Sequence, residues 1–140
     1  MGGMGGMGMF SVEPGKVRRV PVPIVCLEHG KTDPNPRVPY EIRPIESFTD
    51  NRQVAEICAM LGRGEIPRNV AQAAAWHLTD EMSWDELASK NRVQLSNGYT
   101  ERYFAPQELA LAMRVVGEAA RRAQESSPTS PGEDYSFSQN

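Results

Sequence analysis

The sequence predicts a small, single-domain α+β protein with three or four helices packed against short antiparallel strands. Three observations support this class. Several segments repeat apolar residues every three or four positions, as amphipathic helices do. One segment alternates apolar residues with prolines, and the pair Asn97-Gly98 lies between two strand-like runs. With 140 residues, 39% of them hydrophobic, the chain can bury one modest core. We therefore expect one domain over residues 11–123.

Both ends of the chain are predicted to be flexible. Residues 1–10 form a low-complexity Gly/Met linker, and residues 124–140 are rich in Ser, Pro, Gly and Asp. Such a linker usually tethers a domain, so we expect a further segment upstream. Residues 1–9 carry no positive charge and no apolar h-region, so no signal peptide is recognised, and no apolar run approaches the length of a membrane span.

The first ordered segment is predicted to be an edge strand that carries Cys26. Between Lys16 and Cys26, apolar residues alternate with Pro21 and Pro23, which lack the N–H group that a central strand needs. A turn-rich loop follows, and a second short strand is expected over residues 38–42.

Two helices are predicted next. Asp50 is the expected N-cap of the first, with Gln53 at the capping-box position and Gly62 at its end. The second covers residues 69–80, with Asn69 as N-cap and Gln72 as capping-box partner. Its core-facing residues are predicted to be Ala71, Ala74, Ala75 and Leu78.

The C-terminal part of the domain is predicted to be a short helix, a hairpin and a long helix. Ser83 and Glu86 form a capping-box pattern that starts the short helix. The hairpin lies within residues 93–104 and turns at Asn97-Gly98. Pro106 suits the first turn of the long helix, whose apolar repeat fades near Arg122.

Charge and cysteine content restrict the classes of function. The net charge of −3 comes from interspersed acidic and basic residues, so no cationic face for nucleic acid is expected. Cys26 and Cys58 are too few for a disulfide framework, although a single bond between them is compatible with the sequence.

Two short motifs stand out against this background. One is Val25-Cys26-Leu27, and the other runs from Ala71 to Trp76 with Gln72 and Trp76 on one helix face. Together they resemble the thioester domain family of secreted and surface-anchored bacterial proteins, in which an apolar-Cys-apolar motif precedes an apolar-Gln-x-x-apolar-Trp motif. The resemblance covers about residues 20–87, although the interval between Cys26 and Gln72 is short and Ala75 replaces the usual isoleucine or valine.

The resemblance implies an internal thioester between Cys26 and Gln72, formed by thiolate attack on the amide with loss of ammonia. Trp76, His77 and Asp80 are expected to shield or support this bond. The free N–H groups at the start of the helix are expected to stabilise an oxyanion on Gln72. A domain of this family is adhesin-like: it binds a protein partner covalently, typically through a lysine amine. The resemblance therefore implies a secreted or cell-surface binding module that is not an enzyme and needs no catalytic residue, metal or cofactor.

Three alternatives remain open from the residues themselves. Gln72, Trp76 and Cys26 fit equally well as a helix cap, a core aromatic and a small buried residue, which leaves a non-covalent interaction or scaffold domain. A zinc site would take two ligands from the Cys-x-x-His spacing of Cys26 and His29. Its other two ligands would be Cys58 and His77, which stand singly on two different helices. A cysteine-nucleophile enzyme would need Cys26 with His29 or His77 as base and Asp80 as orienting group.

Overall fold

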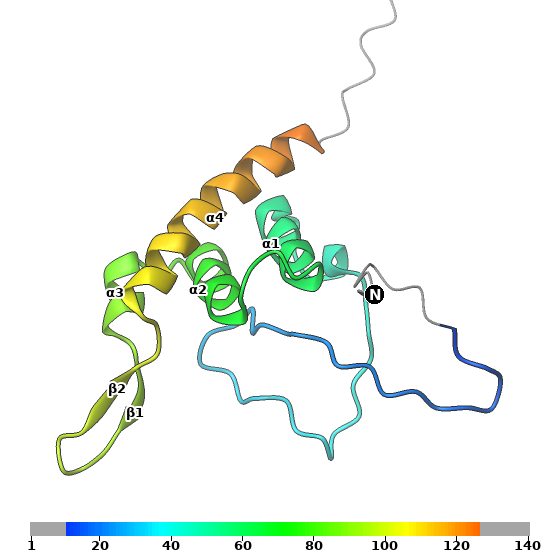
Figure 1. The fold of residues 1–140 in the computed structure, drawn as a ribbon, viewed down its shortest axis with the longest axis horizontal. Helices are drawn as coiled ribbons and strands as arrows, with labels where there is room; N and C mark the ends of the chain where they lie inside the picture. Colours follow the sequence, from blue (N-terminus) through cyan, green and yellow to red (C-terminus); the bar gives the residue numbers. More distant parts are fainter. Residues whose placement is uncertain (1–10, 127–140) are drawn as a thin grey trace, which may run out of the picture.

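The computed structural model describes residues 11–126. Within them the chain forms four α-helices, one short 3₁₀ helix and a two-stranded antiparallel sheet, which confirms the α+β class (Figure 1). The elements are η1 (Ile45–Ser47), α1 (Arg52–Gly62), α2 (Arg68–Thr79), α3 (Trp84–Ser89), β1 (Asn91–Gln94), β2 (Thr100–Arg102) and α4 (Pro106–Glu125). Of the two predicted tails, residues 1–10 and 127–140 lie outside the described residues, whereas Gln124 and Glu125, assigned to the C-terminal tail, belong to α4.

The core lies where α4 crosses α1 and α2 (Figure 1). Helix α2 has α4 on one side and the segment of residues 24–29 on the other, and seven consecutive residues, from Val70 to Trp76, are buried. Four of the seven are small alanines, which allow neighbouring backbone to approach closely. The predicted core face of this helix is confirmed: Ala71, Ala74 and Ala75 are fully buried, and Leu78 packs against the core.

Helix α1 begins one residue later than expected. Its N-cap is Asn51, whose side-chain oxygen accepts hydrogen bonds from Gln53 N (2.9 Å) and Val54 N (3.4 Å). The prediction that Asp50 is the cap is therefore wrong. Asparagine and aspartate offer the same acceptor geometry, and only the backbone decides which of two neighbours is the cap. The helix ends at Gly62, as predicted, and Gly64 (φ +76°) turns the chain toward α2.

The start of α2 also differs from the prediction. Pro67 is the N-cap residue, with extended backbone and no side-chain capping bond, so Asn69 lies inside the first turn. Gln72 is consequently the fifth residue of the helix and caps nothing. Its side chain is used elsewhere, as described below.

Neither strand predicted before α1 is formed. Residues 16–26 and 38–42 are extended or irregular, and they belong to a long excursion on the side of the helices away from α4, which reaches α2 near residues 24–29 (Figure 1). Pro21 and Pro23 cannot donate to a ladder, and no second strand pairs with this segment in the described part of the chain. Side chains of α2 satisfy part of its backbone instead.

The elements after α2 follow the prediction closely. Ser83 caps α3 in a full capping box with Glu86, with hydrogen bonds of 3.0 and 3.2 Å. Strands β1 and β2 pair antiparallel around a turn in which Gly98 has φ +90°. Helix α4 starts at Pro106 and continues past Arg122 to Glu125.

Among the described residues, every helix is too short or too polar to cross a membrane.

Candidate functional site

One face of α2 holds the segment of residues 24–29. The side chains at positions 68, 72, 76 and 80 are spaced by four residues, so they form a stripe along the helix. Arg68 Nε donates to Ile24 O (2.9 Å) at one end of the stripe, and at the other Asp80 Oδ1 accepts from His29 N (3.1 Å). The stripe therefore contacts both ends of the segment.

Gln72 forms the central contact of this stripe. Its side chain is completely buried, and among the described residues it is the one buried polar side chain. The amide Oε1 accepts a hydrogen bond from Cys26 N (2.9 Å), and Nε2 donates to Cys26 O (2.8 Å). Burying an amide is costly unless both ends are paired, and here both are paired with one residue. The structure therefore brings the predicted pair Cys26 and Gln72 into direct contact.

Trp76 lies one helical turn beyond Gln72 and is 6% exposed. The ring of His29 meets it edge-on, with centroids 4.8 Å apart at 89°, and Tyr103 lies 5.4 Å away on the hairpin side. The indole Nε1 is buried without a hydrogen-bond partner in the described protein. Trp76 is thus a largely buried aromatic wall beside the Cys26–Gln72 contact, where a shield was predicted.

His29 is positioned from two sides. Its backbone is held by Asp80, whose other carboxylate oxygen lies 2.6 Å from the Thr79 hydroxyl. Its ring Nε2 lies 3.0 Å from Lys90 Nζ, and this amine is 5.2 Å from the centroid of the Trp76 ring and 5.5 Å from that of Tyr103. A primary amine therefore already lies against the imidazole and two aromatic rings.

His29, Trp76, Lys90 and Tyr103 line one cleft with a volume of about 690 Å³, whereas Gln72 and Asp80 are not part of its wall. Cys26 lies half-buried in its wall. The cleft is polar and mixed in charge, because both basic and acidic side chains reach it. Its charged residues are Arg68, Lys90, Arg92, Lys31, Glu28 and Asp33.

Of the predicted shielding residues, Trp76 and Asp80 lie at this site and His77 does not. His77 stacks on Trp84 with ring centroids 4.2 Å apart at 19°, and its Nδ1 lies 2.8 Å from Met82 O. One residue along a helix is a rotation of about 100°, so a side chain next to Trp76 in sequence points elsewhere. The structure therefore places the His77 ring against Trp84 and not beside the Cys26–Gln72 contact.

Sequence reasoning missed three contributors to the cleft. Arg68 was recognisable, since it precedes Gln72 by four residues and so shares its helix face. His29 was weighed only as a metal ligand or a base, and Lys90 carried no signal, because its place beside Trp76 depends on how the hairpin folds back.

The alternatives that need other residues find little geometric support. Cys26 and Cys58 are both free, so the disulfide considered above is not formed. Cys58 lies on α1, where burial raises the pKa of its thiol. Within residues 11–126, no three His, Cys, Asp or Glu side chains gather in a way that would hold a metal ion.

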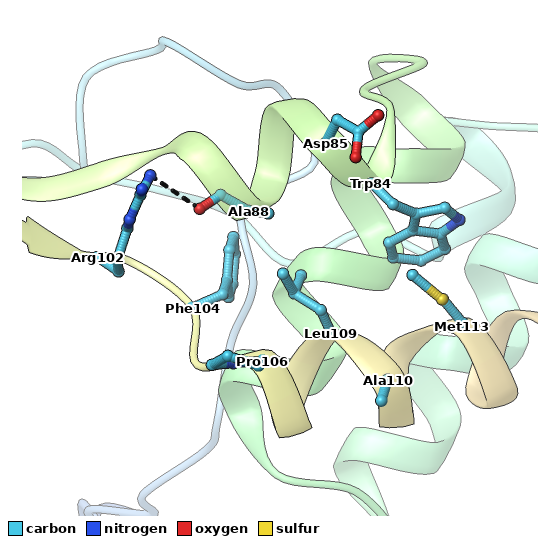
Figure 2. A pocket seen from close by; sticks show the side chains of 9 residues that line it. All are labelled: Trp84, Asp85, Ala88, Arg102, Phe104, Pro106, Leu109, Ala110 and Met113. Atoms are coloured by element: carbon cyan, nitrogen blue, oxygen red, sulfur yellow. Dashed lines mark hydrogen bonds between the residues drawn. The ribbon is translucent and has the colours of Figure 1, made fainter.

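A second hollow of about 450 Å³ lies between α3, the end of β2 and the first turns of α4 (Figure 2). Its walls are mainly apolar, with Phe104, Leu109 and the Trp84 ring prominent. Arg102 crosses one edge and donates from Nη1 to Ala88 O (3.1 Å). None of the predicted site residues lines it, so the polar cleft is the better candidate site.

The Cys26 N–H can also polarise the Gln72 amide. Its nitrogen lies 2.9 Å from Gln72 Oε1, the atom on which negative charge would develop if the carbonyl were attacked. The sequence predicted this role for the free N–H groups at the start of the helix, but Gln72 lies beyond them at the fifth position.

Comparisons with protein-family models, curated proteins and solved structures found no match.

Proposed function

We propose that this domain is a covalent binding module that stores an acyl group as a thioester between Cys26 and Gln72 and transfers it to an amine of a protein partner. The observation that carries the proposal is the paired contact between the buried Gln72 amide and the backbone of Cys26, a residue that lines a polar cleft together with Trp76. A module that uses its bond once is a binding protein and not a turnover enzyme.

We propose that the bond forms at this contact. Cys26 Sγ attacks Gln72 Cδ, the C–S bond forms, and the C–N bond to Nε2 breaks as ammonia leaves with the thiol proton. In the tetrahedral intermediate, negative charge develops on Oε1, where the Cys26 N–H already donates. The hydrogen bonds that hold the Cys26 backbone against Gln72 of α2 keep the two residues close together, which favours their reaction.

Capture of a partner reverses the roles of sulfur and nitrogen. A partner amine attacks Gln72 Cδ, the new C–N bond forms, and the C–S bond breaks. One proton passes from the amine nitrogen to the leaving sulfur, which restores the Cys26 thiol. Trp76 limits access of water to the bond, because it is almost fully buried along the same helix face.

The decisive test is the intact mass of freshly purified protein before and after treatment with methylamine. We expect a mass lower than that of the sequence by one ammonia, and a gain of one methylamine located on Gln72 by peptide mapping. A mass equal to that of the sequence, with Cys26 freely alkylated, contradicts the thioester and favours a non-covalent interaction domain that uses the same cleft.

The matched control compares the two cysteines. Cys26→Ala removes the sulfur but keeps both hydrogen bonds to Gln72, because these use only the Cys26 backbone. We expect this variant to remain folded and to show neither the mass deficit nor methylamine uptake. Cys58→Ala, on α1, should retain both. If only Cys58→Ala lost the mass deficit, Cys58 and not Cys26 would carry the thioester, and the proposal would be wrong.

The partner class and location follow from the same chemistry. Covalent capture through an amine is most useful where a bond must resist dissociation, as in attachment to a surface. We therefore propose a protein partner with an accessible lysine and a secreted or cell-surface location. A partner that stays attached after boiling in denaturant, and only with Cys26 present, supports this assignment.

A further inference from the structure

We propose that His29 accepts the proton of the attacking amine, and that Lys90 occupies the amine's place in the cleft until the partner displaces it. This inference rests on the proposed thioester and deepens it, since it assigns the proton acceptor for capture.

The position of His29 is the first support. The residue follows Cys26 by three positions, and the docking of residues 24–29 on α2 fixes its backbone through Asp80. Its ring edge contacts Trp76 and its Nε2 faces the cleft that Cys26 lines. A general base must lie within hydrogen-bond reach of the proton that it accepts, and the cleft presents this imidazole to an entering ligand.

The contact with Lys90 is the second support. A lysine ammonium has only donors, so His29 Nε2 is the acceptor when Lys90 is protonated. At 3.0 Å, the imidazole already receives a hydrogen bond from a primary amine. The rings of Trp76 and Tyr103, both within 5.5 Å of the lysine nitrogen, attract an ammonium at this place. An alkyl amine of a partner has the same chemistry and fits the same contacts.

The proton balance is complete without another reactant. As the partner nitrogen bonds to Gln72 Cδ, its proton moves to His29 Nε2 and the C–S bond breaks. The imidazolium then returns the proton to the Cys26 thiolate, so that a neutral imidazole and a thiol remain. Lys90 keeps its own protons and only vacates the position.

Other titratable and charged groups surround the imidazole. Those from elements packed against it are Lys90, Arg92, Tyr103, Arg68 and Asp80, and those of its own loop are Glu28, Lys31 and Asp33. Because His29→Gln leaves all of them in place, the difference between the pH profiles of the two proteins isolates the imidazole.

The test uses the full chain and measures capture of methoxyamine, a weakly basic amine that is mostly unprotonated near neutral pH. Intact mass first verifies that each protein carries the thioester. We expect His29→Gln to capture about a hundredfold more slowly, at the low end for proton-transfer catalysis, and to lose the rise in rate with pH that the parent protein shows. Lys90→Met should capture faster than the parent, since the competing amine is gone. His77→Gln, with its ring stacked on Trp84, is the matched histidine control.

The outcomes separate this inference from the proposal beneath it. A parent protein without the ammonia deficit overturns the thioester and this inference together. A deficit in all proteins with equal capture rates in the parent and His29→Gln overturns the role of His29 alone. Slower capture in Lys90→Met overturns the placeholder role, because it would make the Lys90 amine a requirement and not a competitor.

Discussion

At the scale of single residues, Gln72 explains most of the site. Its amide satisfies both backbone groups of Cys26, and this is why a segment with two prolines and no partner strand still has a defined position. Arg68 and Asp80 contact the same segment, but both are at least partly exposed, and charged contacts at a surface contribute less. The buried amide therefore dominates the docking.

We expect Gln72→Ala to lower the free energy of unfolding by about 2–3 kcal/mol, because it removes two hydrogen bonds and leaves a cavity in a buried place. Chemical denaturation followed by tryptophan fluorescence measures the loss. Gln107→Ala, at an exposed position near the start of α4, is the matched control and should change stability little. Equal stability of the two variants would show that Gln72 does not hold the segment.

At the scale of elements, a chain of ion pairs joins the loop after α1 to the last turns of α4. Glu65 receives hydrogen bonds from Arg63 and Arg122, and Glu118 receives them from Arg121 and Arg122. The hydrogen bonds from these guanidinium groups lower the pKa of Glu65 and lower that of Glu118 to about 2. Arg122 thus connects the two carboxylates.

This network predicts a loss of stability in acid. A carboxylate whose pKa is depressed by folding stabilises the native state above its unfolded pKa of about 4.3, and this contribution disappears as the pH falls through the folded value. The melting temperature should therefore fall as the pH is lowered from about 4.5 toward 2. Both carboxylates lie near the surface, so salt should weaken the effect.

The glutamate variants provide the check. In Glu118→Gln, the melting temperature should change less with pH in this range. The control Glu101→Gln, which replaces an exposed glutamate of β2, should keep the pH dependence of the parent protein. An unchanged slope in Glu118→Gln would show that the network does not respond to acid.

At the scale of the whole molecule, the chain has a helical core with an extended segment attached to it. Helices α1, α2 and α4 share the core, while residues 24–29 are held mainly by side chains of α2 (Figure 1). Regions with few buried contacts open locally at lower free energy than the core. The site is therefore built between the helical core and a segment that we expect to be less stable than the core.

Hydrogen exchange should show this order. We expect the slowest amides in the middle of α2, intermediate protection at Cys26 N, and fast exchange at the exposed residues 40–43. In Gln72→Ala, the Cys26 amide should exchange as fast as residues 40–43 while the middle of α2 stays protected. Mass spectrometry of peptic peptides, or nuclear magnetic resonance, measures this difference. Acceleration throughout α2 would instead mean that segment and helix unfold as one unit.

The sequence by itself determined the elements whose signals are local. The capping box of Ser83, the turn at Asn97-Gly98 and the proline start of α4 require only neighbouring residues, and all three are confirmed. The apolar stripes of the helices also gave the core correctly, because a period of 3.6 residues places them on one face. The motif residues Cys26 and Gln72 were recognisable, and they meet.

Tertiary structure alone decided what the extended segment pairs with and which side chains surround the site. A run that alternates apolar residues and prolines looks like an edge strand, but a strand needs a partner, and here α2 supplies side chains instead. The cap positions at Asn51 and Pro67 depended on where the backbone turns. Lys90 reaches His29 and Trp76 across many intervening residues, and such distant contacts follow from packing, which no local pattern encodes.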